Sequence, residues 1–251
     1  MTINFIGLGL IVLAAILIIV MNIIHRKRPY RGFRQAPAFN KLRQAIGLAV
    51  EDGSRVHVAL GNSSLTGQQG ASGLMGLSVL DRIAQYASIS DAPPIATTGE
   101  GAFSILSQDT LRTTYRNAFA SDLYDATQGR MTGTSPAAFV AGTLPVIQEE
   151  QISANILMGH FDTQVALLAD AAEDRNQFTL AASDSLPAQA VLYAAARESL
   201  IGEELFAAGH YLQVSPFHSA SLRAQDILRW GIAAAIVLGA LYKLIVSLGI
   251  L

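Results

Sequence analysis

The sequence predicts an α/β domain of three layers with a mostly parallel sheet, flanked by an N-terminal and a C-terminal transmembrane helix. Apolar segments at 5–24 and 227–251 predict the two helices, because a helix of about 20 residues spans roughly 30 Å of hydrocarbon. Strand-like runs followed by helical runs recur about four times between them, and parallel strands need such crossovers. We therefore expect a transmembrane helix (1–24), a basic juxtamembrane stem (25–50), a cytoplasmic domain (51–226) and a second transmembrane helix (227–251).

The first apolar segment has the features of a signal anchor rather than of a cleaved signal peptide. Residues 1–4 have no charged side chain, whereas the basic run 25–28 follows the segment directly. Positively charged flanks stay in the cytoplasm. We expect a two-pass protein of the cell membrane with a cytoplasmic central domain. An apolar helix buried in a soluble fold is the alternative for either segment.

Charge is distributed unevenly along the chain. Residues 1–50 contain seven Lys or Arg and no Asp or Glu, whereas the remainder holds ten basic and nineteen acidic residues. A basic stem is attracted to anionic lipid head groups, so the lipid bilayer is the expected partner. The acidic body argues against nucleic-acid binding. The absence of cysteine excludes disulfides, a thiolate nucleophile and cysteine metal sites.

The expected strands are short apolar runs at 55–60, 94–97, 154–158 and 178–182. His57 alternates with β-branched neighbours in the first run, so we expect a buried histidine whose hydrogen bonds are satisfied. In an open parallel sheet, ligands bind at the carboxyl ends of the strands. Any ligand should therefore contact the loops after Leu60, Thr97, Met158 and Ala182.

Helices are expected where apolar residues recur every three or four positions. In the helix that ends near Ala87, the residues Gly73, Leu77, Leu80 and Ala84 form one such face. Ser135 followed by Pro136 is a helix-start signal. The remaining expected helices are 101–118, 135–151 with a kink or break at Pro145, 162–174, 187–199, and a helix or helix plus strand at 201–213, with a loop or broken helix at 122–134.

The glycine-rich stretch 61–73 is the candidate binding loop. A loop between a strand and a helix N-terminus presents backbone N–H groups and the helix dipole to an anion. The stretch lacks the Lys-Ser/Thr ending of a P-loop and the G-x-G-x-x-G spacing of a dinucleotide fingerprint, which favours a tight structural turn instead. If it binds a ligand, the contacts should come from Gly61, Ser63, Ser64, Thr66, Gly67, Gly70 and Gly73.

No catalytic or metal-binding motif stands out, so we assign no catalytic residue, metal or cofactor. Ser63 and Ser64 do not lie in a G-x-S-x-G elbow. The five histidines include no i, i+4 pair of the kind that binds zinc. His160 and Asp162 could form a polar pair, although Asp162 is better explained as a helix N-cap.

Three segments, 108–112, 189–194 and 198–212, carry a resemblance to a known family. Together they resemble an uncharacterised family of prokaryotic membrane-anchored proteins known only as a domain of unknown function. The resemblance spans roughly residues 30–226 and implies one domain. It implies no activity, substrate or catalytic residue.

Three classes of function follow, in order of preference. The first is a non-enzymatic, self-assembling membrane scaffold, the second a ligand- or nucleotide-sensing domain that uses the loop after Leu60, and the third a hydrolase or transferase with a site built from distant loops. Gly231, Ala235 and Gly239 form a small-residue stripe in the second apolar segment. Because such stripes allow close helix packing in lipid, we expect contact with the first helix or with another protomer, and hence a homo-oligomer. Lys243 continues this spacing and either pairs with protein or snorkels outward.

Overall fold

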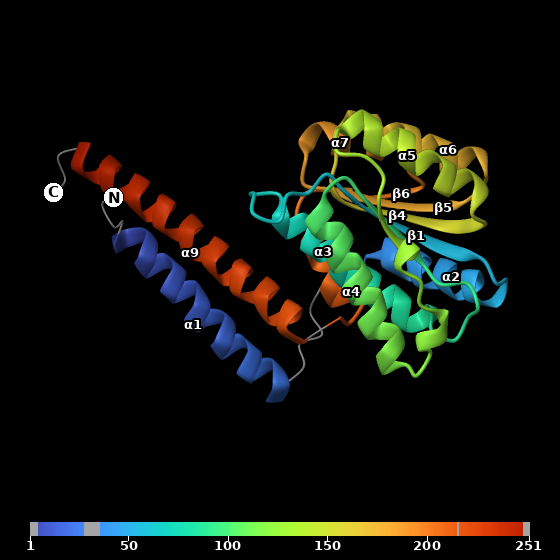
Figure 1. Ribbon diagram of the computed structural model, residues 1–251. Helices are drawn as coiled ribbons and strands as arrows, with labels where there is room; N and C mark the ends of the chain where they lie inside the picture. The colour runs from blue at the N-terminus through green and yellow to red at the C-terminus, as the bar shows by residue number, and fades with distance from the viewer. Residues whose placement is uncertain (1–4, 28–35, 215, 248–251) are drawn as a thin grey trace. The chain divides into compact units, whose positions relative to one another are not determined.

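The computed structural model describes residues 5–27, 36–214 and 216–247 (Figure 1). The chain divides into two compact units, one of residues 1–34 with 215–251 and the other of residues 35–214. The second unit is the α/β domain. It begins earlier than the expected boundary at residue 51 and ends before the expected one at residue 226.

Two long helices, α1 (Phe5–Lys27) and α9 (Pro216–Ser247), lie side by side in the first unit. By length and composition, the segments Gly7–Ile24 and His218–Ser247 could each cross a membrane. The second helix begins before residue 227 because the polar sequence ahead of the apolar run is also helical. Residues 248–251 of the expected second span lie outside the described residues.

Six strands form one sheet in the order β3-β2-β1-β4-β5-β6, and each neighbouring pair is parallel. The four expected strands are present in the interior of this sheet. The two strands that sequence reasoning missed, β3 and β6, have three residues each and form its edges. The strands are β1 (Arg55–Gly61), β2 (Ile95–Thr98), β3 (Gly129–Met131), β4 (Ile152–His160), β5 (Phe178–Ser183) and β6 (Glu198–Leu200).

Helices cover both faces of the sheet, which confirms the three-layer architecture (Figure 1). Successive residues of β1 point to opposite faces, so Val58 joins one hydrophobic core and Ala59 the other. The first layer contains α2 (Pro37–Glu51), α3 (Gly70–Ala87), α4 (Gly101–Asn117) and α8 (Glu204–Tyr211). The second contains α5 (Pro136–Glu149), α6 (Ala166–Asp174) and α7 (Leu186–Ala195).

Helix α2 corrects the expected stem. Its apolar residues Phe39, Leu42, Ile46 and Ala49 are buried in the core of the α/β domain. The three- and four-residue spacing of these positions is that of an amphipathic helix. The part of the expected stem that the structure describes after residue 36 therefore belongs to the domain, and its Lys41 forms an ion pair with Glu198 of β6.

Three further expectations need correction or confirmation. The expected helix 187–199 ends at Ala195, and residues 198–200 form β6 because they pair with β5. The stretch 122–134 contains short 3₁₀ turns, Ser121–Leu123 and Ala126–Gln128, and then β3. Helix α5 continues through Pro145 without a break.

A buried row of polar side chains crosses the interior strands. Thr97 Oγ1 lies 2.8 Å from His57 Nε2, and His57 Nδ1 lies 3.0 Å from Asn155 Oδ1. The Asn155 amide donates to Gln177, whose own amide donates to the Ile147 carbonyl. Since the Asn155 oxygen faces His57, Nδ1 carries the proton and Nε2 accepts from Thr97. His57 is thus a satisfied buried histidine, as expected, and burial lowers its pKa from 6.5 to about 4.

Candidate functional site

The sheet reverses its winding between β1 and β4. After β1 the chain enters α3 on one face, whereas after β4 it enters the 3₁₀ turn Thr163–Val165 and then α6 on the other face. In open α/β sheets, ligands bind outside the carboxyl ends of the strands at such a switch point. The strand order also matches one arrangement of nucleotide-binding sheets, but a shared order indicates a position and not a ligand. The loops after β1, β2, β4 and β5 are hereafter the carboxyl-edge site.

The ends of β1 and β4 approach each other very closely. A Cβ atom on Gly61 would lie 2.1 Å from the His160 carbonyl oxygen, and the φ angle of Gly61 is +66°. Any side chain there would clash, and this conformation favours glycine. The backbone amide of Asn62 donates to the carbonyl of His160 at 2.9 Å. Gly61 therefore has a structural role that positions His160.

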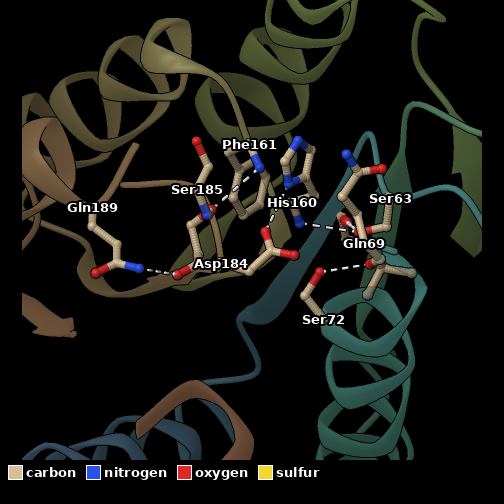
Figure 2. Close-up of polar contacts among 10 residues, drawn as sticks. Ser63, Gln69, Ser72, His160, Phe161, Asp184, Ser185 and Gln189 are labelled. Carbon is tan, nitrogen blue, oxygen red and sulfur yellow. Dashed lines mark hydrogen bonds and ion pairs between the residues drawn. The ribbon is translucent and has the colours of Figure 1, made fainter. Parts of the chain in front are cut away.

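Ser63 is buried and both of its hydrogen-bonding functions are in use. Its hydroxyl donates to the Leu60 carbonyl at 3.1 Å and accepts from the His160 backbone amide at 3.0 Å (Figure 2). A nucleophilic serine needs a base that removes its proton. Ser63 instead ties the loop after β1 to the end of β4.

The residues of the candidate loop are either packed against the domain or accessible to a ligand. A Cβ on Gly70 would lie 2.8 Å from the Leu65 carbonyl oxygen, and one on Gly73 would lie 2.5 Å from the Phe103 ring. These glycines permit the close packing of the loop and α3, which is the structural interpretation of the motif. Ser64 is half-buried, and Thr66 and Gly67 are exposed, so only these three candidate residues remain accessible.

His160 and Asp184 form a polar pair at the carboxyl edge (Figure 2). His160 Nδ1 lies 2.7 Å from Asp184 Oδ1, and the side chains retain 30% and 21% of their accessible surface. Asp162, the less favoured possible partner of His160, instead accepts the Thr163 backbone amide at 3.1 Å. Asp162 caps the 3₁₀ turn Thr163–Val165, which confirms the preferred prediction of an N-cap.

A second set of hydrogen bonds holds the loop that carries Asp184. The Ser183 hydroxyl accepts the backbone amides of Phe161 at 3.3 Å and of Ser185 at 3.2 Å. Gln189 of α7 donates to the Ser183 carbonyl at 2.9 Å, as Figure 2 shows. Both members of the pair are therefore held by bonds that connect β4, β5 and α7. Such a shell keeps functional side chains in a fixed geometry.

The family model described as "Domain of unknown function (DUF6754)" matches residues 2–250. The chain belongs to this family. The match covers both apolar helices as well as the α/β domain, and so it extends beyond the range 30–226 inferred from the sequence. No curated protein and no solved structure matches the chain.

The electrostatics of the carboxyl-edge site do not suit an anion. The stretches 61–73, 99–101, 160–163 and 183–186 contain no Lys or Arg, whereas they contain Glu100, Asp162 and Asp184. Glu100 caps α4 by accepting the Phe103 amide at 3.0 Å. An uncompensated phosphate would be repelled by these carboxylates. Within the described part of the chain, no group of three or more His, Asp or Glu side chains could hold a metal ion.

Hollows elsewhere on the described part of the domain include two of different character. One of about 690 Å³ is lined by residues of α4 and β3, including Arg130. The guanidinium of Arg130 already binds Glu150, with Nη1–Oε1 and Nη2–Oε2 distances of 2.6 Å and 3.3 Å. The other, of about 400 Å³, is an apolar cleft that includes Ile46, Val50 and Tyr86. Neither contains a residue predicted from sequence to bind a ligand.

Proposed function

We propose that this chain is a two-pass protein of the cell membrane whose cytoplasmic α/β domain binds a small, uncharged or cationic polar molecule at the carboxyl-edge site. The observation that carries the proposal is the His160–Asp184 pair, which lies beside the switch point and retains accessible surface. Partly exposed polar groups on rigid strands are typical of binding sites.

The chemistry of the edge supports a particular ligand class. Carboxylates and a neutral imidazole accept hydrogen bonds from hydroxyl and ammonium groups. Ser64 and Thr66, in the loop after β1, are at least partly exposed and offer further hydroxyl groups. A polyol, a nucleoside without phosphate or a small amine fits this set better than a nucleotide does.

The membrane part of the proposal is supported by two features. The apolar segments of α1 and α9 are long enough to span a bilayer. The basic run 25–28 and the further arginines Arg31 and Arg34 follow the first segment. By the positive-inside rule, this bias favours a cytoplasmic domain between the two spans.

A thermal-shift screen of the full chain in detergent tests the binding proposal. Nucleosides, polyols and small amines form one panel, and the corresponding phosphates form the other. A ligand present at 100 times its Kd should stabilise the fold by about 2.7 kcal/mol. His160→Gln should lose the shift, while Glu173→Gln, an exposed position on α6, serves as the matched control and should keep it.

The outcomes of this screen are distinct. A shift caused by the first panel and lost in His160→Gln supports the proposal. Larger shifts with the phosphates would contradict the electrostatic argument. No shift with either panel would remove ligand binding at this site and favour the scaffold.

Self-assembly through α9 is the second candidate function. A Cβ on Gly231 or Gly239 would have no atom within 4 Å, and Ala235 is exposed. The open space at the two glycines supports a second protomer rather than α1 as the partner of this stripe. Ala235→Leu with Gly239→Leu should shift the particle in detergent toward monomer, whereas Val237→Leu, on another face, should not. An unchanged mass in the double variant would eliminate this role.

A further inference from the structure

The geometry points to His160 as a proton acceptor: we propose that its Nε2 takes a proton from a hydroxyl group of the bound molecule. This inference rests on the proposed function and deepens it, because it names the group that the ligand must present. It concerns one atom of one side chain and can be tested without knowing the natural ligand.

The contact with Asp184 determines which nitrogen of the imidazole carries the proton. An ionised carboxylate only accepts hydrogen bonds, so Nδ1, at 2.7 Å from Asp184 Oδ1, must be the N–H donor. The other nitrogen of a neutral imidazole is then an acceptor with a free lone pair. Nε2 makes no hydrogen bond to any residue in the described ranges 5–27, 36–214 and 216–247.

The backbone around His160 is fixed on both sides. Its amide donates to Ser63 at 3.0 Å, and its carbonyl accepts from Asn62 at 2.9 Å. The register of β4 against β5 places Gly159 beside Ser183, so His160 at the end of β4 and Asp184 just after β5 lie next to each other. A base that is held in place in this way loses little freedom when a ligand binds.

The reacting hydroxyl must come from the ligand or from water. Ser63 is the serine bonded to the His160 backbone, and its proton is committed to the Leu60 carbonyl. In the proposed transfer, the ligand O–H bond breaks and an Nε2–H bond forms. The electron pair stays on the ligand oxygen, and the imidazolium is stabilised by the adjacent Asp184 carboxylate. Such a base increases the nucleophilicity of the hydroxyl oxygen.

The competing interpretation is that the pair only ties β4 to β5. In that case Asp184 would contribute to stability, and the identity of the protonated nitrogen would not matter. The proposal instead requires a specific tautomer and an accessible Nε2. Measurements of these two properties separate the interpretations.

Selective ¹⁵N-histidine labelling of the full chain in detergent micelles gives the tautomer by NMR. In wild type we expect a protonated Nδ1 and an unprotonated Nε2 for His160. Asp184→Ala should lose this preference. Asp184→Asn should move the proton to Nε2, because the side-chain amide N–H can donate to Nδ1. An unchanged His57 signal shows that the variants are folded, since His57 lies in the centre of the sheet.

Carbethoxylation by diethyl pyrocarbonate, followed by peptide mass spectrometry, tests access to Nε2. We expect modification of His160 and none of His57, which has no exposed surface. Modification of His160 at Nε2 should slow in Asp184→Asn, where the proton is expected on Nε2. A proton on Nε2 in wild type, or an unreactive His160, would overturn the assignment.

Failure of this inference differs from failure of the proposed function. If hydroxylated ligands stabilise wild type and His160→Gln equally, the site binds ligands but His160 is not the acceptor. If no ligand stabilises the protein, the proposed function itself fails.

Discussion

Protonation of His57 should make the α/β domain sensitive to acid. His57 is fully buried, and in its neutral form both ring nitrogens are hydrogen-bonded, to Thr97 and Asn155. Adding a proton to Nε2 would remove the acceptor that Thr97 uses and would place a charge in the core. Desolvation by burial therefore lowers the pKa of His57 from 6.5 to about 4.

The sign and size of the effect follow from linkage. Between pH 6.5 and about 4, the unfolded chain binds a proton that the folded chain excludes. The stability of the fold is then complete above pH 6.5 and decreases as the pH falls toward 4. At about 1.4 kcal/mol per pH unit, the loss amounts to roughly 3 kcal/mol.

Urea unfolding of the full chain in detergent, followed by circular dichroism from pH 7.5 to 4, measures this loss. The single tryptophan, Trp230, lies in α9 and so its fluorescence does not report on the α/β domain. His57→Gln removes the titrating group, and its stability at neutral pH should be lower because it disrupts the buried row. On acidification the difference between wild type and variant should narrow by roughly 3 kcal/mol. Parallel pH profiles would refute the reasoning.

Four further predictions concern other positions. The buried hydroxyl of Tyr115 has no hydrogen-bond partner among the described residues, and burial raises its pKa; Tyr115→Phe should therefore increase the free energy of unfolding by about 1 kcal/mol in urea titrations. Phe119 is 97% exposed and has a φ of +59° just after the end of α4, a backbone conformation that favours glycine. Phe119→Gly should therefore increase the free energy of unfolding by about 1 kcal/mol, and an unchanged midpoint of urea unfolding would contradict this explanation. A Cβ on Gly76 would lie 2.5 Å from the Met158 carbonyl oxygen, so Gly76→Ala should destabilise by about 1–3 kcal/mol, measured by thermal unfolding. Protease added outside intact cells should leave residues 36–214 uncut; their digestion would reverse the proposed topology.

Gly70 illustrates how the structure changes the choice of test for the binding loop. From the sequence, Gly70→Val is expected to block an anion site without affecting the fold. In the structure a Cβ at this position meets the carbonyl oxygens of Leu65 and Ser64, at 2.8 Å and 3.0 Å. The variant would disturb the loop itself. Substitutions at the exposed Thr66 probe binding with less effect on folding.

Local patterns were enough to predict the interior of the domain. Buried strands such as β1 and β4 are short runs made mostly of apolar residues, and a face such as Leu77, Leu80 and Ala84 on α3 repeats at helical spacing. These signals depend only on neighbouring residues, and the crossovers between them imply a parallel sheet. The edge strands β3 and β6 carry no such signal, because three residues become a strand only when β2 and β5 pair with them.

The sequence by itself determined the two apolar helices and the α/β class, since composition and periodicity are properties of the chain alone. Only the tertiary structure decided the partners of the polar groups. Sequence proximity suggested Asp162 for His160, whereas the parallel register that places Gly159 beside Ser183 brings Asp184 to it. Hydrogen bonds join atoms that are close in space, and the order of strands in a sheet determines which loops of the chain become neighbours.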